Sequence, residues 1–325
     1  MLIDMLSASL AKSGALNDAW AKLDSGQDAT VGVASSARPF LVAARFAADP
    51  RATLVVAAGE EAADTFARTV GAFVGEERVL RLPDYEGNPF SLDAPPQPRL
   101  HGRRLEALWS LQQGKPAVVV ASARALLRRI APAKEEVARP LALVAGSDLS
   151  EEPQRGIACF EDLEHCLVSM GYENSGKLDG PGTFSVQGGA IDVFPGNLAY
   201  PVRLDFFGDE LDEIRRFLPS TGQTISSLGQ VDIFPVREFA QTDAALLRAK
   251  RAISKSAETN AAQRELLERL EDDSHELPDL MAAYLLEKTA AVGDYLSADT
   301  LTVLIEPRSL VDDALQIFAA DLVHG

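Results

Sequence analysis

The chain has 325 residues, of which 46% are hydrophobic, and its formal net charge is −17. This hydrophobic fraction excludes a disordered chain, and the length predicts about two or three domains. The acidic balance argues against a surface that grips nucleic acid, because such a surface needs clustered Lys and Arg.

The cysteines and the hydropathy both favour a cytoplasmic chain. Cys159 and Cys166 are seven residues apart on one face of a predicted helix, which fits burial in a reducing compartment rather than a disulfide. The amino terminus lacks the pattern of a secretory signal, and no apolar run reaches about 18 residues. We therefore expect no membrane partner.

The first 132 residues alternate predicted strands with predicted helices. Strands are expected at residues 30–33, 53–57, 78–82 and 117–121, and the first two are expected to be buried. Helices are expected at residues 1–28, 40–46, 59–74, 99–113 and 123–130, and Ser122 is a suitable cap for the last. A Pro-rich loop at 83–98 is expected to pack rather than to act as a lid. Such alternation implies a mostly parallel sheet.

The alternation breaks at Pro132, and a region of consecutive strands follows. A strand at 141–144 and a helix ending near Gly171 come first, and the segment from Gly182 to Phe217 then reads as successive antiparallel strands. Such a sheet packs one face and leaves the other free. We expect the free face to bind another protein.

The carboxyl-terminal part returns to an α/β pattern. A long solvated helix is expected at 242–272 and a second at about 277–287, before a strand at 301–307 and a helix at 310–323. Residues 299–325 are therefore expected to rejoin the first sheet. The predicted domains are residues 1–132, an inserted α+β domain at 133–239, and residues 240–325, which complete the first.

Two similar pentapeptides occur in the middle of the chain. Residues 231–235 echo residues 191–195, and both end in proline. A repeat is one interpretation. The one we favour is two edge strands, each stopped by its proline.

The loop that would bind phosphate in a nucleotide-binding domain lacks the required residues. It has Gly32, Ser35 and Ser36, but Arg38 stands where a Lys followed by Ser or Thr is needed. Pro39 then removes a backbone donor. We interpret this segment as a degenerate phosphate loop that needs no cofactor.

The acidic motif expected at a strand end is also degenerate. Glu306-Pro307 follows the last predicted strand in place of Asp-Glu, so Glu306 reads as a polar strand end rather than a metal ligand. None of the four histidines has metal-ligand spacing. A nucleotide hydrolase with an unorthodox phosphate loop remains the rival interpretation. The acidic turn at 205–213 is either a solvated hairpin or a site for a basic partner.

The strand-rich segment carries a family resemblance. It lies in residues 171–172, 180–195 and 200–215, and it extends to 82–86, 103–108 and 118–132. These residues strongly resemble the amino-terminal region of bacterial transcription-repair coupling factors (Mfd), and they are similar to the damage-recognition protein UvrB. The resemblance covers most of residues 30–240.

The resemblance implies a UvrB-like module without ATPase activity. Its fold would be a degenerate RecA/P-loop-like parallel-sheet domain, with an inserted domain that binds the repair protein UvrA. Full-length family members continue into an RNA-polymerase-binding domain and a DNA translocase motor. ATP, Mg²⁺, RNA polymerase and DNA are therefore expected to bind there. In the family the UvrA-binding surface is masked by the protein's own carboxyl-terminal domains, so an autoinhibitory scaffold is a third interpretation.

The family arginines that contact UvrA are replaced in this chain. Their positions read Glu173-Asn174 and Gln187. Interface arginines form bidentate, charge-assisted hydrogen bonds, so their absence weakens the expected contact. The candidate partner-binding residues are Asn174, Phe184, Gln187, Gly188 and Arg203.

Overall fold

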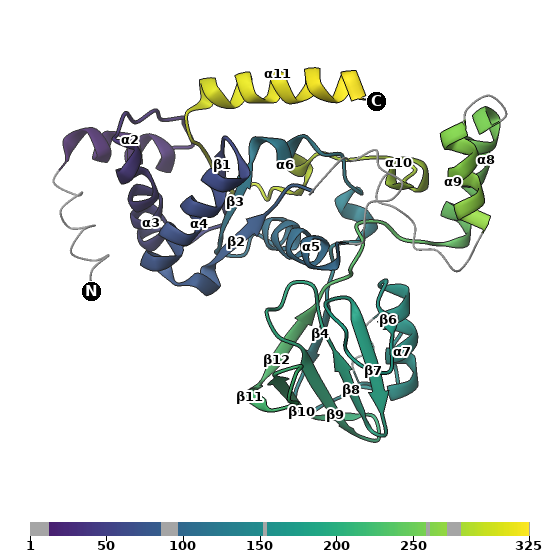
Figure 1. Ribbon diagram of the computed structural model, residues 1–325. Helices are drawn as coiled ribbons and strands as arrows, with labels where there is room; N and C mark the ends of the chain where they lie inside the picture. Colours follow the sequence, from purple (N-terminus) through teal and green to yellow (C-terminus); the bar gives the residue numbers. More distant parts are fainter. Residues whose placement is uncertain (1–12, 86–96, 152–154, 258–260, 272–280, 325) are drawn as a thin grey trace. The chain divides into compact units, whose positions relative to one another are not determined.

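The computed structural model describes residues 13–85, 97–151, 155–257, 261–271 and 281–324 (Figure 1). The start of the first predicted helix, most of the Pro-rich loop and part of the helix expected at 277–287 lie outside these residues. The chain forms two compact units. Unit 1 comprises the chain up to Asp84 together with Ser110–Leu126 and Leu296–His324, and unit 2 comprises Tyr85–Trp109 and Leu127–Tyr295.

Unit 1 is built on a parallel four-stranded sheet of order β13-β1-β3-β2. Its strands are β1 (Thr53–Ala57), β2 (Val79–Leu82), β3 (Val118–Ser122) and β13 (Leu301–Leu304). The two inner strands, β1 and β3, are buried along their whole length, which explains their continuous apolar sequences. All three of these neighbouring pairs are parallel, as expected.

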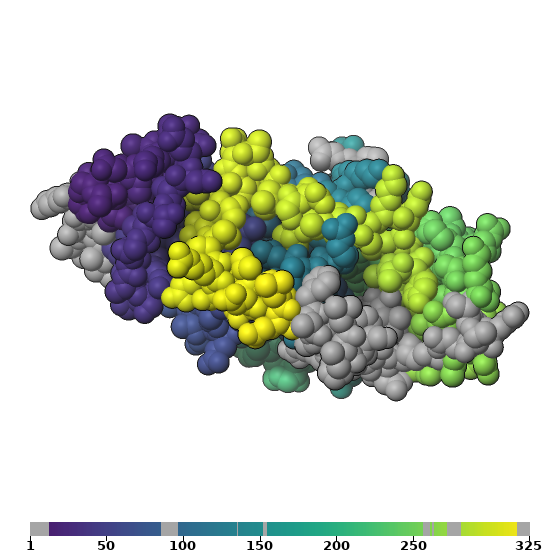
Figure 2. Space-filling model, turned by 90° about the horizontal axis from the view of Figure 1, so that it is seen from above, coloured from purple at the N-terminus to yellow at the C-terminus, as the bar shows by residue number. Residues whose placement is uncertain are grey.

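The helices of unit 1 precede, connect or follow its strands. They are α2 (Gly14–Asp24), α3 (Arg38–Ala48), α4 (Glu60–Val74), α6 (Ala123–Leu127) and α11 (Pro307–His324), with 3-10 turns at Ser35–Ala37 and Glu76–Arg78. Phe46, Phe66 and Val70 of α3 and α4 pack against β1 and β3. Figure 2 shows α11, in bright yellow, at the surface. The predicted Ser122 cap is confirmed, because Ser122 Oγ accepts a hydrogen bond from the Ala125 amide at 3.1 Å.

The strand predicted at residues 30–33 is wrong. These residues are not in a strand, and Val31 and Gly32 are exposed. A short apolar segment forms a strand only where a sheet edge has unpaired backbone groups that can hydrogen-bond with it. Both sides of β1 are occupied, by β13 and β3, so the sheet offers no place beside β1.

Unit 2 contains the expected antiparallel sheet, in the order β11-β10-β9-β8-β7-β6, with β5 paired to β10. The strands are β5 (Ser147–Asp148), β6 (Glu173–Asn174), β7 (Thr183–Gln187), β8 (Ala190–Val193), β9 (Val202–Phe207), β10 (Glu210–Phe217) and β11 (Thr224–Leu228). β6 pairs with β7 in parallel and the other neighbours are antiparallel.

A second, two-stranded sheet joins β4 (Leu141–Val144) to β12 (Gln230–Ile233). The two similar pentapeptides therefore belong to different sheets. Our interpretation of both as edge strands is wrong for β8, which lies between β7 and β9. A proline can follow an inner strand because it lies just beyond the last residue that pairs in the sheet.

One face of the large sheet packs into the core of unit 2. Helix α7 (Phe160–Ser169) contributes Leu163 and Leu167 to this core, and β4 and β12 add their apolar residues. Both cysteines have free thiols, but Cys159 lies at the amino-terminal cap of α7 and only Cys166 is buried. The expectation that both lie within the helix is thus wrong by one residue.

The other helices of unit 2 differ from the prediction in one respect. They are residues 98–109 of α5 (Pro98–Gln112), whose end belongs to unit 1, and α8 (Asp243–Ala257), α9 (Ala261–Glu271) and α10 (Ala282–Leu285), with 3-10 turns at Ala133–Glu135 and Val292–Tyr295. The single helix expected at 242–272 is instead α8 and α9 lying side by side (Figure 1). Ala249, Ile253, Leu266 and Leu270 share one small core between them. The prediction of one long solvated helix is therefore wrong, because α8 and α9 each bury one face against the other.

Unit 2 also buries charged residues that are far apart in the sequence. Arg104 Nε lies 2.5 Å from Glu238 Oε1, and His101 Nδ1 lies 3.6 Å from the same oxygen. The Tyr85 ring stacks with the guanidinium groups of Arg104 and Arg128, at 4.9 and 4.6 Å. Burial alone would raise the pKa of Glu238, but the charge of Arg104 and the hydrogen bond with His101 lower it to about 2.

Candidate protein-interaction site

The second face of the large sheet is polar, and we call it the polar face. Side chains alternate between the faces of a strand, and cross-strand neighbours share a face. Strand register therefore places Ser185, Asp192, Arg203, Arg215 and Ser227 in one row across five strands. The next row contains Gln187, Ala190, Asp205 and Glu213. Ser185 and Asp192 are buried within this face, whereas Gln187 and Ser227 are exposed, so only part of the polar face is open to solvent.

Arg203 is held by Asp192 on the neighbouring strand. Its Nε and Nη2 donate to the two carboxylate oxygens of Asp192, each at 2.6 Å. This hydrogen-bonded pair raises the pKa of Arg203. The guanidinium also lies 5.4 Å from the centre of the Phe217 ring. A partner carboxylate would have to compete with Asp192, so Arg203 orders the face more than it offers a vacant donor.

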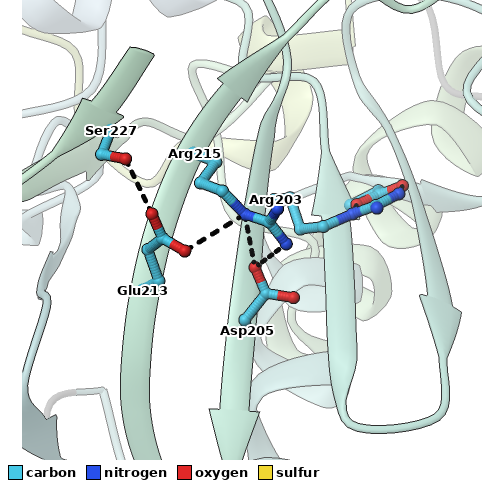
Figure 3. Close-up of polar contacts among 6 residues, drawn as sticks. Arg203, Asp205, Glu213, Arg215 and Ser227 are labelled. Atoms are coloured by element: carbon cyan, nitrogen blue, oxygen red, sulfur yellow. Dashed lines mark hydrogen bonds and ion pairs between the residues drawn. The ribbon is translucent and has the colours of Figure 1, made fainter. Parts of the chain in front are cut away.

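A second network lies beside the first (Figure 3). Arg215 donates to Asp205 Oδ2 through Nη2 at 2.7 Å and through Nε at 3.0 Å, and its Nε lies 3.5 Å from Glu213. Ser227 Oγ donates to the other Glu213 oxygen at 2.7 Å. The charged side chains of the polar face are thus cross-linked across β9, β10 and β11, which gives a preorganised surface.

Two of the predicted contact residues lie at the end of β7. Gln187 is exposed on the polar face, and Gly188 begins the tight turn to β8 with a φ of +61°, in the left-handed region that suits glycine. The structure therefore brings Gln187, Gly188 and Arg203 to one side of the sheet.

Phe184 and Asn174 do not belong to the polar face. Phe184 is 0% exposed and packs in the core, so its side chain is not available to a partner. Asn174 is paired with Phe184 in the sheet, so its side chain lies on the same face, the one that α7 covers. There its Nδ2 donates to Glu164 Oε1 at 3.0 Å. Alternation instead puts Glu173, opposite Thr183, on the side of Gln187.

The two segments that the sequence predicts to be degenerate nucleotide motifs are joined by an ion pair in unit 1. Arg38 Nη2 lies 2.7 Å from Glu306 Oε1, just beyond the carboxyl end of β13. Gly32, Ser35 and Ser36 are exposed and do not follow a strand of the sheet. Within the described ranges, no cluster of His, Cys, Asp or Glu has the geometry of a metal site.

The sequence reasoning missed Phe207, at the tip of the β9–β10 hairpin. This side chain is 82% exposed. Adjacent strand residues point to opposite faces, so the pair Phe206-Phe207 could have been read as one buried and one exposed ring. Phe206 is the half-buried partner and packs against the core.

Comparisons with known proteins agree with this architecture. Residues 157–239 match the UvrB interaction domain family. The transcription-repair-coupling factor of Myxococcus xanthus is 36% identical over 282 residues, which is 82% of this chain and 22% of that protein. The Bacillus subtilis (strain 168) factor is 29% identical over 244 residues, covering 70% of this chain and 20% of that protein.

This chain corresponds to the amino-terminal, UvrB-like region of the transcription-repair coupling factors. It spans about a fifth of the length of both of these coupling factors. The matched UvrB interaction domain begins just before α7, contains β6–β12 and ends at Phe239. It therefore includes the whole polar face. Among the helices of the described ranges, none is both long and apolar enough to cross a membrane.

Proposed function

We propose that this chain is the UvrA-recruiting module of a transcription-repair coupling factor and acts in transcription-coupled nucleotide excision repair. The observation that carries the proposal is the match of residues 157–239 to the UvrB interaction domain, because those residues form the polar face. A polar face whose charged side chains are cross-linked, and on which Gln187 is exposed, has the character of a protein-binding surface.

We also propose that unit 1 is a degenerate RecA/P-loop-like domain that does not hydrolyse ATP. The Arg38–Glu306 ion pair supports this, because each charge is neutralised by the other at the place where phosphate and metal would need them. In the full-length protein, ATP, Mg²⁺, DNA and RNA polymerase would be bound by other regions. The carboxyl-terminal domains would mask the polar face.

Calorimetric titration with UvrA from the same organism tests the recruiting role. We expect a measurable dissociation constant at low salt, and no binding at tens of micromolar would overturn the proposal. Gln187→Arg should bind UvrA more tightly, since a new bidentate donor is worth about 1.5–3 kcal/mol when it finds a carboxylate. Gln230→Arg adds the same charge on β12, in the other sheet, and should change little.

Thermal denaturation with Mg-ATP tests the loss of nucleotide chemistry. We expect the melting temperature of unit 1 to be the same with and without millimolar Mg-ATP. A ligand present at a hundred times its dissociation constant would add about 2.7 kcal/mol of stability. A shift of that size, abolished by Arg38→Ala, would favour the rival nucleotide-hydrolase interpretation.

A further inference from the structure

At the tip of the β9–β10 hairpin, the aromatic ring of Phe207 is exposed on a backbone that hydrogen bonds hold in place. Phe207 is the most exposed of the large hydrophobic side chains in the described residues. Burying a phenylalanine is favourable by about 1.5–3 kcal/mol, so its exposure forgoes that gain. Aromatic residues are enriched among the side chains that dominate binding energies at interfaces.

The backbone around Phe207 is held from several sides within unit 2. The Phe160 amide, at the start of α7, donates to Asp209 Oδ1 at 2.9 Å, and the Leu149 amide donates to the Asp209 carbonyl at 3.1 Å. The Phe206 ring packs edge-on against Phe160, with 5.2 Å between their centres. The backbone that carries Phe207 is therefore already ordered before a partner binds, so binding costs little backbone entropy there.

Phe207 lies beside the turn that carries the predicted partner contacts. The Phe206 amide donates to the Gly189 carbonyl at 2.8 Å, which joins the β9 end to the β7–β8 turn. Asp205 shares a cross-strand row with Gln187, and Phe207 is two residues further along β9 on the same face. Phe207 is thus continuous with the exposed end of the polar face.

The charges around the Phe207 ring indicate the chemistry of the surface that would bind it. Glu210, the cross-strand neighbour of Phe207, and Asp212 are exposed, and neither makes an ion pair with any residue that the structure describes. Lys and Arg are absent from residues 204–214. A surface that covers Phe207 must therefore provide an apolar pocket, and basic side chains around that pocket would complement the carboxylates.

We propose that Phe207 is the anchor of the UvrA contact and inserts into an apolar pocket with a basic rim on UvrA. This inference rests on the proposed recruiting function and adds the residue that dominates the contact. It also explains how an interface that lacks the two family arginines can keep its affinity for UvrA. Burial of the Phe207 ring would supply the binding free energy that charged hydrogen bonds at position 187 do not supply here.

The test is calorimetric titration of UvrA from the same organism into the full chain and two variants. Phe207→Ala removes the anchor. Tyr200→Ala is the matched control, because Tyr200 is an exposed aromatic residue just before β9, at the opposite end of that strand. We expect Phe207→Ala to bind at least tenfold more weakly, and Tyr200→Ala to bind like the unchanged chain. The melting temperature should be the same in all three.

The outcomes separate the inference from the proposed function. If the unchanged chain binds and Phe207→Ala binds equally well, the anchor is disproved and the recruiting function stands. If the unchanged chain does not bind UvrA, both are overturned. A much lower melting temperature for Phe207→Ala would contradict the exposed position of the ring. Glu210→Lys should weaken binding more at low than at high salt, and unaltered binding would refute the basic rim.

Discussion

The buried Arg104–Glu238 pair is the residue-scale feature with the largest expected effect on stability. Both side chains are almost completely buried, and they lie 134 positions apart in the sequence. A buried charge is tolerated only while its partner is present. Arg104 belongs to a segment that resembles the coupling-factor family, and the structure gives it a role in folding.

Replacing Glu238 should therefore destabilise unit 2 strongly. Glu238→Ala leaves Arg104 buried without its carboxylate, which costs about 3–5 kcal/mol. Urea denaturation at neutral pH measures this, and Glu210→Ala is the control, because Glu210 is exposed. A loss below about 1 kcal/mol for Glu238→Ala would show that the pair contributes little.

The same pair predicts the response to acid. The pKa of Glu238 in the folded chain is about 2, below its ordinary value of 4.5. The stability that ionised Glu238 contributes is therefore fully present above pH 4.5 and is lost as the pH falls from about 4.5 to 2. Denaturation midpoints of unit 2 should fall over this range, and Glu238→Gln should flatten the fall.

At the scale of elements, the start of α5 packs closely against the turn after β8. A Cβ added at Gly102 would lie 2.5 Å from the backbone nitrogen of Asn197. Arg99 reinforces the contact, since its Nη1 donates to the Leu198 carbonyl at 3.0 Å and its guanidinium lies 5.5 Å from the centre of the Phe194 ring. The Pro-Gly-Asn segment that ends β8 therefore also packs against the start of α5.

Gly102→Ala should separate these two elements. Overpacking of this kind costs about 1–3 kcal/mol, more than the gain in helix propensity. Gly71→Ala in α4 is the matched control, because its added Cβ would meet its nearest atom at an ordinary 3.5 Å and should be neutral or stabilising. Chemical denaturation of both variants gives the comparison. Equal stability of the two would contradict the close approach.

At the scale of the whole molecule, unit 1 is assembled from three separate segments of the chain. β13 pairs with β1 along four residues, and Val303 and Ile305 pack against the core of α3 and α4. The strand that returns after unit 2 therefore completes the sheet that the first segment begins. The exact division at 1–132, 133–239 and 240–325 remains a prediction.

Removing residues 299–325 should damage unit 1 and spare unit 2. The truncated chain exposes one edge of β1 and loses the packing of Val303, so we expect unit 1 to become sensitive to limited proteolysis. The polar face contains no deleted residue, so UvrA affinity should stay within about twofold of the full chain. Loss of UvrA binding together with unit 1 would show that the two units are coupled.

The sequence by itself determined most elements and the class of the two larger sheets, one parallel and one mainly antiparallel. Local signals sufficed where a segment is buried on both faces, as in residues 53–57 and 118–122, or carries its own cap, as at Ser122. Alternation likewise predicted the strand at 202–206 and a second sheet face outside the core, although Ser185 and Asp192 on that face are buried. Family resemblance then predicted the partner, which local physics alone does not identify.

Only the tertiary structure decided which residues of similar local sequence become buried, paired or exposed. Residues 30–33 have strand-like sequence but no vacant place beside β1, and α8 and α9 form two helices because they bury each other. Phe184 and Phe207 are both strand aromatics, yet one lies in the core and the other is exposed at a hairpin tip. Pairings such as Arg38–Glu306 and Arg104–Glu238 depend on where distant segments meet, and no local pattern encodes that.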